Sequence, residues 1–108
     1  MKIVSFETAK LAKEKGFSIG CDWQYDEFGN IVDGLYMPHY FKAPCQYQLM
    51  DWLREEHGFL INIRHRKGDG FGYSYRSLDG TTENLHFDRF SDYYKCLERA
   101  LQKILNLI

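Results

Sequence analysis

The stretch "APCQYQLMDWLREEHGFLINIRHR", residues 43–66, decides the fold, because its hydrophobic period changes at Gly58. Before this glycine, Leu49, Trp52 and Leu53 recur at the spacing of one face of a helix. After it, the letters "FLINIRHR" alternate between apolar and polar residues, as in a half-buried strand. The stretch therefore predicts a helix that ends at a glycine and leads directly into a strand.

On the C-terminal side of this unit, a second strand and a last helix are predicted. "KGDG", residues 67–70, is a turn signal, and "FGYSYRSL", residues 71–78, alternates again. The polar stretch "DGTTENLHFDRF", residues 79–90, is interpreted as a connection. Ser91 would cap a helix that continues to the C-terminus with one strongly apolar face.

On the N-terminal side, a helix and a hairpin are predicted. Ser5 would cap a helix over Glu7–Lys15, which Gly16 would stop. In the segment "CDWQYDEFGNIVDGLY", residues 21–36, apolar and polar residues alternate on both sides of a Gly29-Asn30 turn signal. This pattern is typical of two antiparallel strands.

The predicted order of elements is thus α-ββ-α-ββ-α, which indicates the α+β class. The 108 residues correspond to one domain over 1–108. We expect a single four-stranded antiparallel sheet with the helices packed on one face.

Composition limits the function. A net charge of −1 gives no overall attraction to nucleic acid or to an anionic membrane. No apolar run approaches the roughly 18 residues of a spanning helix, and the start "MKIVSFETAK" does not resemble a signal peptide. The odd number of cysteines, at positions 21, 45 and 96, favours three free thiols in the cytoplasm.

Cys45, at the start of the central helix, is a candidate nucleophile, because a helix N-terminus can lower the pKa of a thiol. His57 lies at the other end of the same predicted helix, about 18 Å away at 1.5 Å per residue, so it cannot act as the base for Cys45. His65 falls on the inward row of its strand. The pattern favours a residue that simply begins the helix.

Two other chemical patterns are weak. The histidines and cysteines do not stand at the spacings of zinc ligands, so no metal and no cofactor are expected. The glycines of "KGDGFGYSY", residues 67–75, resemble a phosphate loop but join two strands instead of opening a helix. A hairpin turn explains them.

The basic residues of the second hairpin form a more informative pattern. Arg64 and Arg66 alternate with Ile61 and Ile63, and Arg76 falls on the matching row of the next strand. If the helices cover one face of the sheet, these arginines share the other face. That face would be a docking surface for a protein or for single-stranded nucleic acid, or else a solvated face with cross-strand ion pairs.

A second candidate surface is the loop "MPHYFKAP", residues 37–44, with the rings of Tyr36, Tyr40 and Phe41. Such a loop is either packed or an exposed recognition patch, and packing is favoured. Trp23 and Trp52 are both predicted to be core residues.

Several segments together resemble a family. They are "VSFETAKLAKEKGF", "AP" followed by Gln48-Leu49, "WLREEHG" leading into "INI", and the closing "LNLI". In these segments the chain resembles small uncharacterised proteins encoded by phages and prophages of gut bacteria, which often carry threonine where this chain has Cys45. The resemblance implies a small cytoplasmic accessory protein that acts by binding, with no catalytic residue to transfer.

The sequence therefore predicts a non-enzymatic binding protein. Its partner would be another protein or a second copy of itself, bound through the open sheet face or the aromatic loop. One alternative is a module that binds single-stranded nucleic acid. The other is a small cysteine-dependent hydrolase that uses Cys45. No membrane association is expected.

Overall fold

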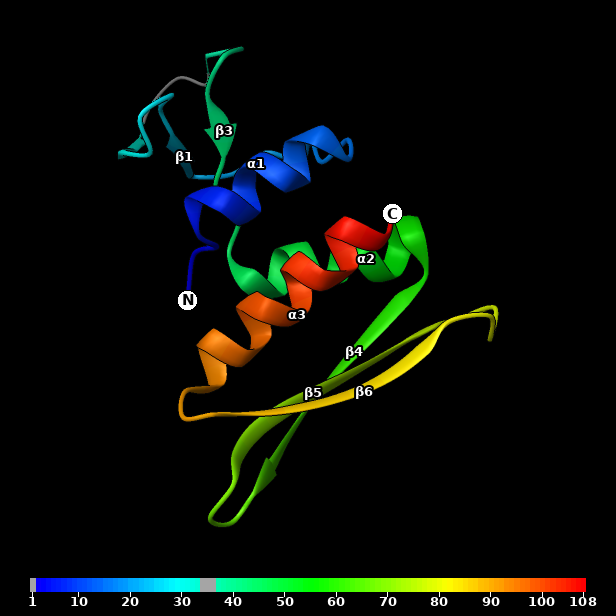
Figure 1. Cartoon of the computed structure of the whole chain (residues 1–108). Coiled ribbons are helices and arrows are strands. Elements are labelled where there is room, and N and C mark those ends of the chain that lie inside the picture. The colour runs from blue at the N-terminus through cyan, green and yellow to red at the C-terminus, as the bar shows by residue number, and fades with distance from the viewer. Residues whose placement is uncertain (1, 34–36) are drawn as a thin grey trace.

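The computed structural model describes residues 2–33 and 37–108, except for the side chains of 85–88. Three helices and two three-stranded antiparallel sheets form this part of the chain (Figure 1). The elements are, in chain order, α1 (Phe6–Glu14), β1 (Trp23–Tyr25), β2 (Ile31–Asp33), β3 (Phe41–Lys42), α2 (Gln46–His57), β4 (Phe59–Arg66), β5 (Gly70–Ser77), β6 (Glu83–Phe90) and α3 (Tyr93–Leu107). The predicted α+β class is confirmed.

Each helix begins at a side chain that accepts a hydrogen bond from its first turn. The Ser5 hydroxyl accepts from the Thr8 N–H at 3.2 Å, as predicted for α1. At α3 the cap is Asp92 rather than the predicted Ser91, and its carboxylate accepts from the N–H groups of Tyr94 and Lys95 at 2.7 and 3.1 Å. A carboxylate that accepts two such bonds also lies favourably at the positive end of the helix dipole.

The single four-stranded sheet that the pattern predicted is divided in the structure. The two predicted hairpins lie in separate sheets, with strand orders β2-β1-β3 and β4-β5-β6. The first hairpin gains the short strand β3, which pairs with β1. The second gains β6, formed by a segment interpreted as a polar connection. The hydrogen bonds of the Asp79 carboxylate with Ser77 and Thr81 shape the turn that brings β6 back along β5.

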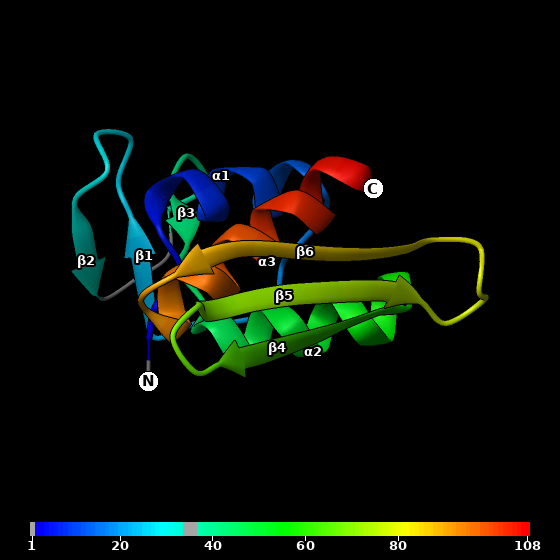
Figure 2. The same ribbon diagram turned by 60° about the horizontal axis from the view of Figure 1, so that its bottom comes forward.

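The helices and sheets are stacked in layers (Figure 1). Helices α2 and α3 lie side by side on one face of the β4-β5-β6 sheet, and α1 lies beyond them, next to the small sheet. The other face of the large sheet faces away from all three helices (Figure 2). Among the described residues, no helix is both long and apolar enough to cross a membrane.

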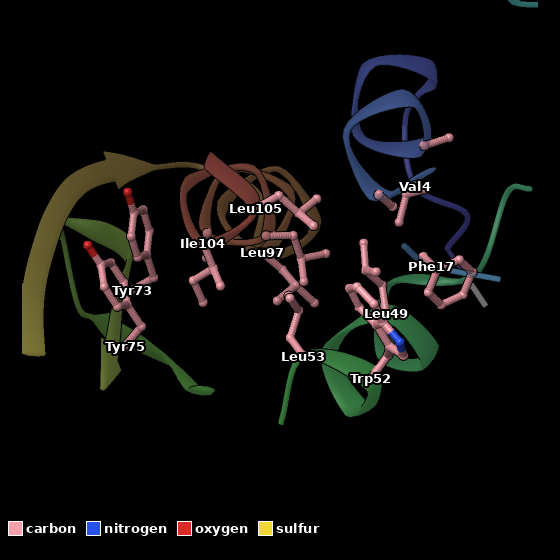
Figure 3. Close-up of a cluster of buried hydrophobic side chains, with 14 of the residues drawn as sticks. Val4, Phe17, Leu49, Trp52, Leu53, Tyr73, Tyr75, Leu97, Ile104 and Leu105 are labelled. Carbon is pink, nitrogen blue, oxygen red and sulfur yellow. The ribbon is translucent and has the colours of Figure 1, made fainter. Parts of the chain in front are cut away.

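The core lies between the helices and the large sheet (Figure 3). Leu49 and Leu53 of α2 meet Leu97 and Ile104 of α3, and all four side chains are fully buried. On the sheet side, the core is closed by two tyrosine rings of β5 that stack on each other, with centroids 6.4 Å apart.

One tryptophan follows the prediction and the other does not. Trp52 is buried and meets the Phe17 ring edge-on at 5.3 Å. Trp23 is 42% exposed, which corrects the prediction that it belongs to the core. It lies in the small sheet, whose strands are too short to cover it. The three cysteines are free thiols, as predicted.

Candidate binding face

The large sheet presents one open face, and strand alternation places the arginines on it. In β4, Ile61 and Ile63 pack against the core, so the residues between them point to the opposite side. Arg64 and Arg76 lie on this opposite side, on neighbouring strands, and both are exposed. Arg66 continues the same row at the end of β4. This is the arrangement that the alternation predicts.

A shallow hollow of about 620 Å³ lies on this face. Its lining combines both arginines with apolar residues, amide and hydroxyl groups and one carboxylate. The lining residues are Leu60, Ile61, Asn62, Arg64, Ser74, Tyr75, Arg76, Glu83 and Asn84. The hollow therefore offers two guanidinium groups, together with further hydrogen-bonding groups, to a partner.

Neither arginine in the hollow forms an ion pair with a described side chain. The ion pairs among the described side chains lie elsewhere, at Glu27–His39 and where Arg54 meets Asp51 and Glu55. Glu83 is the register partner of Arg76 across β5 and β6. Even so, no ion pair between these two is found among the described residues. The cross-strand ion pairs of a merely solvated face are thus missing from the described part of the hollow.

The tyrosines of the large sheet lie on the wrong side to bind bases. Tyr73 and Tyr75 are buried against the helices, as Figure 3 shows. Proteins that bind single-stranded nucleic acid stack bases on exposed rings along a basic groove. Among the described side chains of the three strands, the row that carries Arg64 and Arg76 contains no ring.

The aromatic loop is held against α1. The Lys13 ammonium donates hydrogen bonds to the carbonyl oxygens of Pro38 and Tyr40 at 2.7 and 3.0 Å. Phe41 packs edge-on against Phe6, with ring centroids 5.6 Å apart. Tyr36, the third predicted ring, lies outside the described residues. These contacts agree with the packed form of the loop.

Cys45 is the N-cap of α2. Its sulfur accepts a hydrogen bond from the Gln48 N–H at 3.4 Å. The three histidines with described side chains lie against other groups: His57 meets the Trp52 ring at 4.8 Å, His65 meets Phe71 at 4.7 Å and His39 lies 3.3 Å from Glu27. The described residues contain no cluster of three histidine, cysteine or acidic side chains that could hold a metal ion.

A polar cluster that the sequence pattern did not predict joins the three helices. The Glu98 carboxylate, on α3, accepts hydrogen bonds from the Ser5 N–H at 2.9 Å and from the Gln46 side-chain amide at 3.0 Å. It also accepts from the Thr8 hydroxyl, while the same Gln46 amide donates to the Tyr94 carbonyl at 2.9 Å. The one sequence signal for this cluster was Glu98 itself, an acidic residue beside the apolar face of α3. We assign this cluster a structural role.

The sequence also did not indicate the hollow itself. Asn62 and Ser74 share the arginine row and were predictable from alternation, but Glu83 comes from β6, which was not predicted as a strand. Comparisons with protein families, with curated proteins and with solved structures each gave no match for this chain.

Proposed function

We propose that this chain is a non-enzymatic binding protein whose open sheet face docks a carboxylate-bearing segment of another protein. One observation carries the proposal: Arg64 and Arg76 line the same hollow, and neither forms an ion pair with a described side chain. A guanidinium presents its donors in a planar fork that fits a carboxylate. Two such forks above one hollow favour a segment with at least two acidic side chains.

Protein is favoured over nucleic acid as the partner for two reasons. The net charge of −1 adds no long-range attraction to a phosphate backbone. The described side chains on the arginine row offer guanidinium, amide, hydroxyl and carboxylate groups but no stacking ring. We place this function in the cytoplasm, where three free thiols stay reduced. The resemblance to phage and prophage proteins makes proteins of the phage and of its bacterial host the first partners to test.

The test is an array of immobilised peptides with different numbers of Asp and Glu residues, probed with fluorescently labelled protein. We expect the wild type to prefer acidic peptides, and the double variant Arg64→Glu/Arg76→Glu to lose that binding. The melting temperature should change little, because exposed charges contribute only about 0–1 kcal/mol each.

The matched control is Arg54→Glu/Arg99→Glu, which makes the same change in charge at two exposed positions outside the hollow. This control should bind as the wild type does. Equal binding by both double variants would refute the proposal. Single-stranded oligonucleotides in the same assay test the alternative: tight binding that falls steeply with salt would identify nucleic acid as the ligand instead.

A further inference from the structure

Strand β4 is a long edge strand whose pairing with β5 contains no bulge. It forms one margin of the sheet and pairs with β5 alone, in an unbroken register from Phe59↔Ser77 to Arg66↔Gly70. The opposite margin, β6, is interrupted by a register shift opposite Phe71 and Tyr73. Such bulges protect an edge from pairing with another chain. No such shift interrupts the β4–β5 register.

The register fixes which main-chain groups of β4 point to this free edge. The Leu78 N–H donates to the Gly58 carbonyl at 2.7 Å, just before the strand begins. Because bonding direction alternates along an antiparallel ladder, the even-numbered residues of β4 bond to β5. The odd-numbered residues Phe59, Ile61, Ile63 and His65 therefore point their N–H and C=O groups outward. Among the described residues, no main-chain bond beyond the sheet ladder uses these outward groups.

We propose that two copies of this chain pair antiparallel along β4, about a twofold axis at Asn62. In this register Ile61 faces Ile63 of the second copy, and Phe59 faces its His65. Every outward residue then has a partner, and the facing pairs exchange about eight main-chain hydrogen bonds, two for each pair. A register centred on Ile61 or Ile63 would leave one outward residue at the end of the strand unpaired.

Side chains select the same register. On the open face, Leu60 faces Arg64 of the second copy, so like charges do not meet. A twofold axis at Arg64 would instead place the two Arg64 side chains opposite each other, which is unfavourable. On the helix side, Ile61 and Ile63 are only partly buried, and a second copy would cover them. The inference concerns the edge of the sheet and goes beyond the proposed function of its face.

The first measurement is the mass of the purified chain in solution by size-exclusion chromatography with light scattering, over a range of concentrations. The expected result is a particle of twice the 12.8 kDa chain mass that dissociates on dilution. A monomer at every concentration would overturn the inference. No partner protein is present, so this outcome is independent of whether the open face binds acidic segments.

The second measurement tests the register by changing one charge. Leu60→Glu would face Arg64 of the second copy at two symmetric places and should lower the dimer dissociation constant about tenfold. Leu60→Arg should raise it by about the same factor, and adding Arg64→Glu to that variant should restore dimerisation. If Leu60→Glu and Leu60→Arg change the dimer dissociation constant in the same direction and to the same extent, the proposed register is wrong.

The third measurement uses the residue on the axis. In the proposed dimer the Asn62 Cα atoms of the two copies are about 4.5 Å apart, a separation that a disulfide can bridge. Asn62→Cys treated with oxidised glutathione should give a covalent dimer on a non-reducing gel. The control is Ser74→Cys, at the register partner of Asn62 on the next strand. On the same gel this variant and the wild type should both run at the mass of a single chain, because neither places a cysteine on the axis. Equal cross-linking of both variants would exclude the twofold axis at Asn62.

Discussion

At the scale of single residues, Cys21 shows how packing changes the chemistry of a thiol. Burial is the main cause that raises its pKa from 9.0 to about 11, and nearby Lys42 opposes the shift. The thiol donates to the Ile19 carbonyl at 3.3 Å and lies 3.8 Å from the Gln48 side-chain oxygen. The folded chain therefore keeps this proton at a pH where the unfolded chain has lost it.

This shift predicts the sign of a pH effect. Between about pH 9 and 11 the unfolded state binds fewer protons at Cys21, so the free energy of unfolding should fall as the pH rises. Urea melts of the wild type and of Cys21→Ala across this range measure the effect. The decline should be steeper in the wild type, because lysines and tyrosines titrate in both proteins. Parallel declines would show that Cys21 does not contribute.

At the scale of elements, two glycines of one turn should respond differently to alanine. Gly68 and Gly70 have φ angles of 87° and 84°, which disfavour any side chain. A Cβ at Gly68 would meet nothing within 4 Å, whereas one at Gly70 would lie 2.5 Å from the Phe90 carbonyl oxygen. We expect Gly68→Ala to cost about 1–2 kcal/mol. Gly70→Ala should cost roughly 3 kcal/mol or more, because β6 must move.

Chemical denaturation of both variants gives the two differences in unfolding free energy. Equal losses would mean that the end of β6 does not lie against Gly70.

The elements that the sequence predicted are those with a strong local signal. Ser5 and Gly58 mark helix ends by their own chemistry, and the alternation of Ile61 and Ile63 placed the arginines on the open face. Strand β6 escaped prediction because its polar residues suit an open sheet face as well as a loop. Strand β3 has two residues and no pattern. The division into two sheets, and with it the hollow, depends on contacts between segments far apart in the chain.

At the scale of the whole molecule, the small sheet is tied to the rest through α1. The Tyr25 hydroxyl donates to the Val4 carbonyl at 2.7 Å, and the Phe6 ring contacts Tyr25 at 5.5 Å. Residues of α1 belong to the same core as α2 and α3. These links predict one cooperative unfolding transition for the chain as a single domain.

The two tryptophans can test this cooperativity. Trp52→Phe leaves Trp23 as the only fluorescent indole, in the small sheet, and Trp23→Phe leaves Trp52 in the core. In each variant, the fluorescence midpoint in urea should coincide with the loss of helical circular dichroism. If Trp23 reports an earlier transition than the helices do, the small sheet unfolds on its own.

The hydrogen bonds of Glu98 have a consequence for how the chain folds while it is being synthesised. The Ser5 N–H and the Thr8 hydroxyl lie 93 and 90 residues before their acceptor. During translation α1 therefore leaves the ribosome about 90 residues before the carboxylate that accepts its hydrogen bonds. The β4–β5 hairpin lies between them in the chain and can form during this interval. Docking of α1 onto α3 is thus a later step than closure of this hairpin.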